Sequence, residues 1–433
     1  MISAVDAVKP GHSSGTGAKR YALGLLVIVY TFNFIDRQVL SILLPAIKAE
    51  FAAGDSVLGF LAGPAFAVLY ATLGIPIAFL ADRSNRRNLI AIALAIWSGM
   101  TALSGLATGV AHLVLARIGV GIGEAGCSPP AHSLIADYYP PAKRSTAMGV
   151  YTLGISAGIM IAYLAGGWVA ENIGWREAFF IVGIPGLVLA LLVRFTVREP
   201  VRGSSEQRTD RGRLPGIVTV ARFLVARRSF LHMAVGAGLA SFVGYSVLSF
   251  FPSFLTRSFS MSIADVGLYL GLLIGIAGGI GFAGGGYIAD NIGKKSHRRA
   301  LHTIAALLLL GWVFVFPVYL ASTARWSLIA AIIPTVLSNV YLATTFAQTQ
   351  NLAPLRMRSV ASAILLFLIN IVGLGLGPLL AGMLSDALAD SLGIESMRYS
   401  LLIIGAVMTP WTAFHYFMAG RHIEHDLARA DDV

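Results

Sequence analysis

Residues 74–87 read GIPIAFLADRSNRR, an apolar run that ends in an acid and a cluster of arginines. Residues 284–295, GGGYIADNIGKK, repeat this arrangement at an offset near 210. Residues 143–167 and 357–382 agree at the same offset, because both begin near an Arg-Ser pair and run through glycines to a small-residue end. Two matches at one offset predict that the chain consists of two similar halves.

The composition is typical of an integral membrane protein. Of the 433 residues, 56% are hydrophobic and 12% are charged, and the mean hydropathy is +0.76, far from that of soluble proteins. A spanning helix needs roughly 20 mostly apolar residues, and continuous apolar runs lack the alternation of a barrel strand. We therefore predict an all-α fold of twelve transmembrane helices in two six-helix bundles, with spans at about 22–46, 57–80, 88–108, 112–136, 145–170, 177–197, 231–255, 264–288, 300–321, 326–349, 359–388 and 398–419.

The basic residues predict the orientation of these spans. One set of connections, which includes both tails, carries 25 of the 32 Lys and Arg residues, and the opposite loops carry five. Because loops rich in Lys and Arg stay in the cytoplasm, we expect both termini to be cytoplasmic. We also expect the protein to lie in the cell (inner) membrane. We expect the apolar run after Arg20 to be the first spanning helix, because it is too long for the core of a signal peptide.

The predicted organisation follows from these spans: a cytoplasmic tail (1–21), a six-helix bundle (22–197), a basic linker (198–230), a second six-helix bundle (231–420) and a C-terminal tail (421–433). The linker has eight arginines against three acids. Its last part, LPGIVTVARFLVARRSF (214–230), is either a short amphipathic helix on the anionic leaflet or a solvated connection.

Several classes of function are excluded. The net charge of +11 is spread between apolar runs, whereas nucleic-acid binding needs basic residues on one soluble face. The single cysteine, Cys127, can form no intrachain disulfide and no cysteine metal cluster. No Walker loop is present, so ATP is not the driving force, and we expect no cofactor. His132 and His232 lie near predicted span ends, where interfacial positions explain them.

Three stretches of the first half carry a resemblance to known transporters. ADRSNRR (81–87) and LARIGVGIGEAG (115–126) resemble motifs of the major facilitator superfamily. FNFIDRQVLSILLPAIKAEF (32–51), LADRSNRR and RIGVGIGEAGCSPPAHSLIADYYPPAKRSTAMG (117–149) resemble more closely a bacterial member of the Spinster lipid transporters. This resemblance implies alternating access, a substrate site between the halves, and movement of a sphingolipid-like or lysophospholipid-like molecule.

Two alternatives stay open at this point. Organic-anion transporters of the same superfamily resemble this chain in their Asp-Arg pair and in an Arg seven residues before a Glu, and they move small acids with protons. A membrane-embedded enzyme is the alternative from a different class. It would need a nucleophile or metal site with an adjacent acid and base, and the sequence offers acids and arginines without a histidine pair at ligand spacing.

Four charged residues lie at membrane depth, well inside predicted spans, where charge is costly. They are Asp36 and Arg37 in the first span and Arg117 and Glu124 in the fourth. Arg117 and Glu124 are two turns apart and share a face. If both spans hide their charges from lipid, the four residues form one cluster.

We expect Glu124 to carry the coupled proton, because an apolar surrounding disfavours a charged carboxylate. Asp36 is the second candidate. Arg37 and Arg117 can offer planar forks to a phosphate or carboxylate, so that protonation of an acid would free an arginine for substrate. The structural alternative is an ion-pair network that only locks one state.

Other polar residues divide between latches and substrate contacts. The charged ends of the cytoplasmic turns are expected to act as conformational latches: Asp82, Arg83, Arg86, Arg87, Arg144, Asp290, Lys294 and Arg358. The spans of the second half hold no charge well inside the membrane, and their cavity-facing candidates are Tyr245, Ser246, Ser249, Asn339, Tyr341, Thr344, Gln348 and Asn370. One charged wall and one apolar wall favour an amphipathic anionic or zwitterionic lipid. We expect a functional monomer whose partners are this substrate, protons and membrane lipid.

Overall fold

The computed structural model describes residues 16–201, 216–354 and 357–429, which are helical apart from short connections. Parts of the predicted tails and linker (1–15, 202–215 and 430–433) lie outside the described residues, as do residues 355 and 356. The described chain contains 11 segments long and apolar enough to cross a membrane. The last segment, Val360–Ala428, contains two passes joined by η4 (Gly393–Glu395), so the prediction of an all-helical fold of twelve passes is confirmed.

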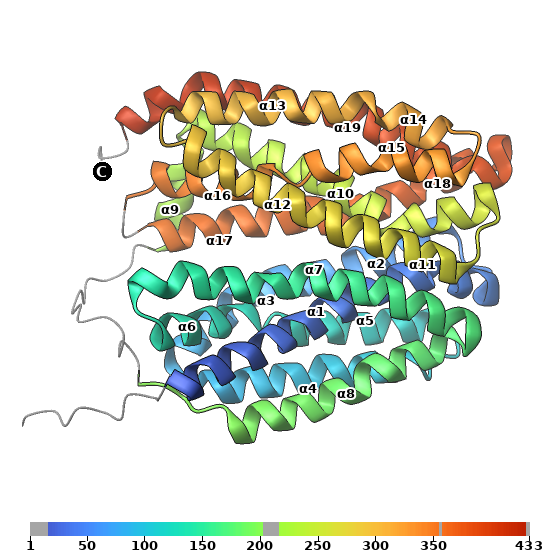
Figure 1. Ribbon diagram of the computed structural model, residues 1–433, viewed down its shortest axis with the longest axis horizontal. Coiled ribbons are helices and arrows are strands. Elements are labelled where there is room, and N and C mark those ends of the chain that lie inside the picture. The colour runs from blue at the N-terminus through green and yellow to red at the C-terminus, as the bar shows by residue number, and fades with distance from the viewer. Residues whose placement is uncertain (1–15, 202–215, 355–356, 430–433) are drawn as a thin grey trace, which may run out of the picture.

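Figure 1 shows the helices in two groups. The lower group contains α1 (Thr16–Phe51), α2 (Asp55–Ala62), α3 (Pro64–Arg83), α4 (Arg86–Ser104), α5 (Val110–Glu124), α6 (Ser128–Tyr138), α7 (Pro141–Asn172) and α8 (Trp175–Thr196). The upper group contains α9 (Ile217–Val225), α10 (Arg228–Phe259), α11 (Ile263–Leu272), η1 (Leu273–Ala277), α12 (Gly278–Tyr287), η2 (Ile288–Ile292), α13 (His297–Val313), α14 (Val315–Leu320), α15 (Ala324–Leu337), α16 (Tyr341–Leu352), α17 (Arg358–Ile369), η3 (Asn370–Leu376), α18 (Gly377–Leu392), η4 and α19 (Ser396–Ala428). We call the end where Thr16 and Ala428 lie the terminal end and the opposite one the distal end.

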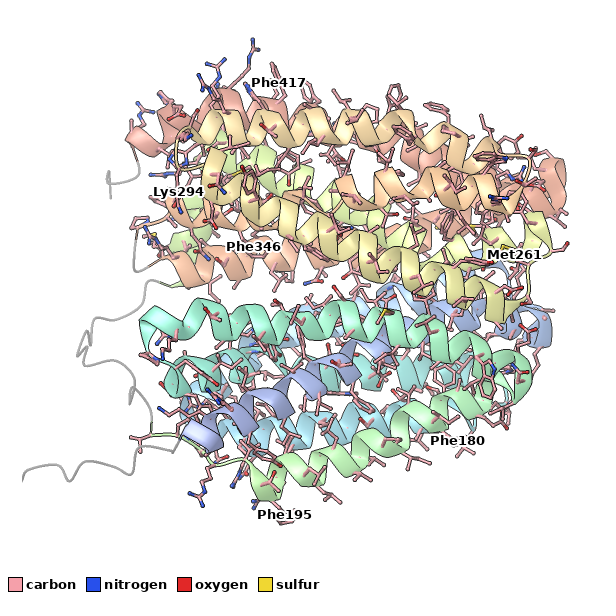
Figure 2. The ribbon with its side chains drawn as sticks, in the orientation of Figure 1. Phe180, Phe195, Met261, Lys294, Phe346 and Phe417 are labelled. Atoms are coloured by element: carbon pink, nitrogen blue, oxygen red, sulfur yellow. The ribbon has the colours of Figure 1, made fainter. Side chains whose placement is uncertain are left out.

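Large apolar side chains cover the outside of both bundles. Phe195 and Phe417 point away from the bundles in Figure 2, and Phe195 is 75% exposed. Lys294 lies at the terminal end in the same view. Such a continuous apolar surface is stable only in lipid, which agrees with a multi-pass membrane protein.

Four predicted spans differ from the structure because their helices are interrupted. In the second bundle, the span 300–321 is interrupted at Phe314, and the span 326–349 is interrupted between Leu337 and Tyr341. The other two lie in the first bundle. The second span divides at Gly63 into α2 and α3, and Pro64 begins α3. The fourth span was expected to be continuous over 112–136, but α5 ends at Glu124 and α6 begins at Ser128. Pro129 and Pro130 follow directly, and proline favours the first turn of a new helix because it lacks an N–H group. Glu124 is therefore the last residue of an interrupted helix.

The sequence left two possibilities for the end of the linker, and the structure shows a helix there. In α9, Val220 and Leu224 are buried, and this helix packs against α10 and α17. Val218 and Val225 are exposed on its other side. The helix is thus apolar on two faces, one of which contacts the second bundle.

The two bundles meet closely at the distal end. A Cβ atom added to Gly167 of α7 would lie 2.7 Å from the carbonyl oxygen of Ile263, so only glycine allows α11 to approach this closely. Glu171 accepts a hydrogen bond from the backbone N–H of Ala264 at 2.7 Å. Midway along α7, the Tyr163 hydroxyl donates to the carbonyl of Leu248 at 2.5 Å.

Asp55 is the centre of a second distal contact between the bundles. Its carboxylate, 2% exposed, accepts two hydrogen bonds from Arg257 of α10 at 2.6 and 2.7 Å. Lys48 donates to it at 2.6 Å and Ser385 of α18 at 2.7 Å. Asp386 in turn accepts from the backbone N–H groups of residues 55 and 56, both at 2.8 Å. Charge-assisted hydrogen bonds of this kind are the stronger ones, so they hold the distal ends of the bundles together.

Candidate functional site

The centre of the site is a buried ion pair between α1 and α5. Arg37 donates to Oε2 of Glu124 from Nη2 at 2.5 Å and from Nε at 3.1 Å. The two side chains are 5% and 0% exposed. Asn33, one turn before Arg37 on α1, accepts a long hydrogen bond of 3.5 Å from Nη2. The structure thus pairs one of the two candidate anion ligands with the first candidate for the proton.

Aromatic rings surround the two arginines. The Arg37 guanidinium carbon lies 4.6 Å from the ring centre of Tyr70 and 4.9 Å from that of Phe66. Phe66 also lies 4.8 Å from the guanidinium carbon of Arg117. A ring face attracts a cation, so Phe66 is positioned between two positive charges that would otherwise repel one another.

Asp36 and Arg117 lie beside this pair without bonding to each other through their side chains. Both oxygens of Asp36 are 2.5 Å from the Thr101 hydroxyl of α4. Arg117 donates to the backbone carbonyls of residues 36 and 37 at 3.3 and 3.1 Å. The prediction that the four charges form one cluster is therefore correct for this structure. The cluster nevertheless contains one direct ion pair, because Arg117 holds the backbone of α1 instead of a carboxylate.

Several buried polar atoms of the cluster have no hydrogen-bond partner in the part of the chain that the structure describes. Among the described residues, Nε of Arg117, Oε1 of Glu124 and Nδ2 of Asn33 are buried without a hydrogen-bond partner. A cavity of about 10 Å³ lies between Asp36, Thr101 and Arg117, close to the smallest space that holds one water molecule. Buried polar atoms without partners are costly, so the cluster can accept a proton, a water molecule or a polar ligand group.

Tyr245 is the candidate of the second bundle that reaches this cluster. It packs with the apolar residues around Phe66 and Tyr70, and its hydroxyl lies within interaction range of the Arg37 guanidinium. The side chain of Tyr245 therefore connects α10 to the charged wall of the first bundle.

The other candidates of the second bundle lie within that bundle. The Asn339 amide donates to the carbonyl of Thr335 at 2.8 Å, and Tyr341 is buried near Tyr416. Asn370 donates to the carbonyl of Leu366 at 2.9 Å, and Ser249 is buried in α10. Hydroxyl and amide groups bonded to the preceding turn are typical of membrane helix interiors. The structure does not bring these four residues to the charge cluster.

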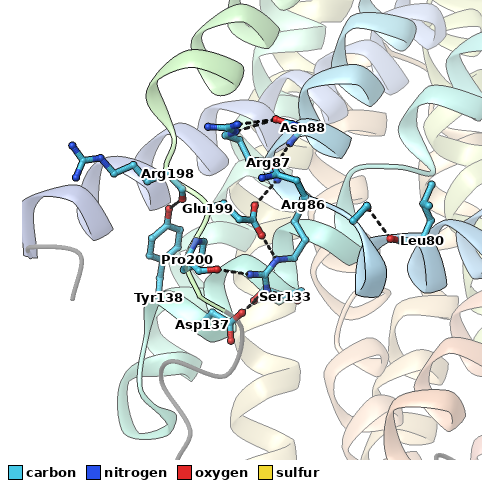
Figure 3. A network of polar contacts seen from close by, with 12 residues as sticks. Leu80, Arg86, Arg87, Asn88, Ser133, Asp137, Tyr138, Arg198, Glu199 and Pro200 are labelled. Atoms are coloured by element: carbon cyan, nitrogen blue, oxygen red, sulfur yellow. Dashed lines mark hydrogen bonds and ion pairs between the residues drawn. The ribbon is translucent and has the colours of Figure 1, made fainter. Parts of the chain in front are cut away.

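Arg86 organises the terminal end of the first bundle (Figure 3). Its side chain, 1% exposed, pairs with Asp137 of α6 and with Glu199, whose Oε1 is 2.7 Å from Nε. Glu199 also accepts from the backbone N–H of Arg87 at 2.9 Å. Arg86 thus joins α4, α6 and the chain after α8. All of these belong to the first bundle, so this contact does not cross to the second.

Four further latch candidates contact residues that are close to them in the sequence. Arg144 donates to the carbonyl of Ala136 at 2.9 Å and Arg358 to that of Ala353 at 3.3 Å. Asp290 and Lys294 form an exposed pair at 3.7 Å. Arg83 is exposed at the end of α3. The side chain of Asp82 lies outside the described part of the chain.

Sequence reasoning missed several partners of the predicted residues. Thr101, Phe66 and Asp55 were not proposed, and neither was the role of Asp137 or Glu199. Asp55 could have been found from the sequence. It lies just before the predicted span 57–80, and Arg257 lies just after the predicted span 231–255, so both are expected at the same side of the membrane. Among the described residues, no group of three or more His, Cys, Asp or Glu side chains is arranged to hold a metal ion.

Two lipid-facing helical bundles with a buried, partly unsatisfied charge cluster are typical of a membrane transport protein. A family model described as Major Facilitator Superfamily matches residues 26–374. The chain belongs to the major facilitator superfamily, and it is a transporter.

The comparisons also confirm the resemblance to Spinster proteins. The chain is 30% identical to a solved bacterial homolog of the human lysosomal transporter Spinster in an inward-facing and unoccupied conformation, with a TM-score of 0.85 over 95% of this chain and 99% of that chain. Protein spinster homolog 1 of Homo sapiens is 31% identical over 87% of this chain and 75% of that protein. An MFS-type efflux pump of Mycolicibacterium smegmatis (strain ATCC 700084 / mc(2)155) is 33% identical over 99% of both chains.

Proposed function

We propose that this transporter is proton-coupled and works by alternating access between the bundles 22–197 and 231–420. The observation that carries this proposal is the buried pair of Arg37 and Glu124 at the end of an interrupted helix. With both acids ionised, the cluster has two positive and two negative charges and is neutral. Addition of one proton leaves a net positive charge, which an anionic substrate group can balance.

In this mechanism Glu124 takes the proton and Arg37 takes the substrate. Protonation of Glu124 removes the charge that Arg37 now contacts, and the guanidinium fork becomes available to a phosphate or carboxylate. Arg117 stays bonded to the backbone of α1 and contributes its charge. Asp36, held by Thr101, is the second proton site. Substrate release then lets Arg37 return to the deprotonated Glu124.

We propose an amphipathic anionic or zwitterionic lipid as the substrate. The charged wall of α1 and α5 suits a headgroup, and α10 presents Tyr245 and small hydroxyl side chains among apolar residues. The resemblance to Spinster proteins supports the same class. Small organic anions are the second candidate, because the pairing of Arg37 with Glu124 also suits a sugar acid or another carboxylate.

We propose that the terminal end faces the cytoplasm and that the protein acts as a monomer in the inner membrane. The distribution of basic residues supports this orientation. Contacts of Asp55 with Arg257 and of Gly167 with α11 close the distal end. On this orientation the described state is inward-facing, the conformation named for the solved Spinster homolog.

A ligand screen tests the substrate class. The purified protein in detergent is heated with lysophospholipids, sphingoid phosphates or sugar acids, and the shift in melting temperature is measured for the wild type and Arg37→Ala. Lipid phosphates are expected to stabilise the wild type and to lose this effect in the variant. Stabilisation by sugar acids alone would overturn the lipid assignment and support the second candidate.

A further inference from the structure

Arg325 differs from the other basic residues of the distal end. The distal loops carry five Lys and Arg residues, and four of them have an acidic partner: Lys48 and Arg257 bind Asp55, Arg176 binds Glu50, and Arg398 binds Glu395. Arg325 is exposed and has no acidic partner among the described residues. Residues 314–333 contain no Asp or Glu. This positive charge is therefore free for an external anion.

An apolar groove lies beside the same helix, α15, although Arg325 is not one of its lining residues. It has a volume of about 620 Å³ and lies between α14 and α15, in the ~300–1,000 Å³ range of ligand sites. Phe314, at which the predicted span 300–321 is interrupted before α14 begins, is one of the residues that line the groove. Phe316 and Leu320 line one side, and Trp326, Ile329 and Ile333 line the other. Every lining residue belongs to the second bundle.

Arg325 directly precedes the lining residue Trp326 in the first turn of α15, and so lies near the distal end of the groove. Arg325 and Ile329 are four residues apart on α15 and share a face. A helical side chain leans toward the N-terminus of its helix, which for α15 is the distal end. Ile333 lies eight residues further on, about 12 Å deeper along the axis. Trp326, 61% exposed, is a residue type that favours the headgroup level of a bilayer.

We propose that this groove binds an anionic phospholipid of the distal leaflet, with the phosphate on Arg325 and one acyl chain between α14 and α15. An arginine fork matches phosphate geometry, and the apolar lining suits a hydrocarbon chain. The headgroup is anionic because Arg325 forms no ion pair among the described residues, and α14, α15 and their connection offer no acid to pair with the ammonium group of a zwitterionic lipid. This site is separate from the cluster around Arg37, and it does not depend on which substrate is transported.

Native mass spectrometry of the detergent-solubilised protein tests this site. Phosphatidylglycerol or phosphatidylcholine with identical acyl chains is added at equal molar ratio, and retained lipid is counted. The wild type is expected to retain phosphatidylglycerol roughly tenfold more strongly, the effect of one hydrogen-bonded charge. Arg325→Gln should reduce retention of phosphatidylglycerol to that of phosphatidylcholine. Ala330→Phe, which fills the groove, should lower retention of both lipids.

Arg299→Gln is the matched control, since Arg299 is an exposed arginine in the first turn of α13 at the terminal end. It should leave the preference unchanged. Melting temperature and gel filtration establish that each variant is folded. Equal retention of the two lipids by the wild type, or equal losses in Arg299→Gln and Arg325→Gln, would overturn the proposal. The proposal would also be overturned if the lipid-free wild type had the mass of a dimer and Ala330→Phe had the mass of a monomer. In that case the groove would bind a second copy of the chain.

Discussion

Arg37 binds Glu124 through Nε and Nη2, at 3.1 and 2.5 Å, at the residue where α5 ends. The pair joins the first and fourth passes at a point where the fourth helix is interrupted. Arg117, two turns earlier on α5, uses its fork on the backbone of α1 instead. The two arginines of the cluster therefore differ in their partners. Arg37 binds a carboxylate that can be protonated, whereas Arg117 binds backbone carbonyls, which cannot.

This difference predicts the effect of Glu124→Gln. Glutamine keeps the shape of the side chain and cannot exchange a proton, so transport into proteoliposomes should no longer respond to a pH gradient. Asp36→Asn is the comparison, and it should retain a response because Asp36 bonds to Thr101 and not to Arg37. If transport still responds to the pH gradient in Glu124→Gln but not in Asp36→Asn, then Asp36 and not Glu124 carries the coupled proton.

Arg37→Lys tests the planar fork. Lysine keeps the charge but cannot bind an anion through two parallel N–H groups, so affinity for an anionic ligand should fall roughly tenfold. Arg117→Lys should have the smaller effect on affinity, because Arg117 contacts backbone carbonyls. Ligand affinity is measured by intrinsic fluorescence or calorimetry in detergent. Equal losses in the two variants would argue against a special role for Arg37.

Asp55→Asn tests the distal contact between the bundles. Its carboxylate accepts from Arg257, Lys48 and Ser385, and loss of a buried partner of this kind costs about 3 kcal/mol. We expect a lower melting temperature and, in spin-label distance measurements across the distal end, a larger open population. Glu50→Gln is the control, because Glu50 pairs with Arg176 within one bundle and 39% of its side chain is exposed. An unchanged distance distribution in Asp55→Asn would show that this contact does not hold the state closed.

Arg86→Lys tests the terminal end. Arg86 uses Nε, Nη1 and Nη2 for partners in α6 and in the chain after α8, and one ammonium group cannot reach all of them. The melting temperature should fall in Arg86→Lys, by an amount that corresponds to about 3 kcal/mol. Arg83→Lys, at an exposed position nearby, should have little effect. A melting temperature in Arg86→Lys equal to that of the wild type would mean that the network adds no stability.

The residues that sequence reasoning identified and those that it missed differ in how their contacts arise. Asp36, Arg37, Arg117 and Glu124 were found because a charge inside a long apolar run is unusual wherever the chain folds. Thr101 and Phe66 were missed because hydroxyl and aromatic side chains are common in membrane helices. Only their positions against α1 make them partners of the cluster.

The sequence alone determined the number of passes, the membrane environment and the repeat of the two halves, because the length and hydrophobicity of a segment are local properties. It also determined which charges had to be hidden from lipid. The tertiary structure decided how those charges pair. Arg37 is 87 residues from Glu124, and Asp55 is 202 residues from Arg257, so each pairing depends on how the helices rotate and pack. The end of α5 at Glu124 places that carboxylate against Arg37, and the depth of a residue along its span could not reveal this contact.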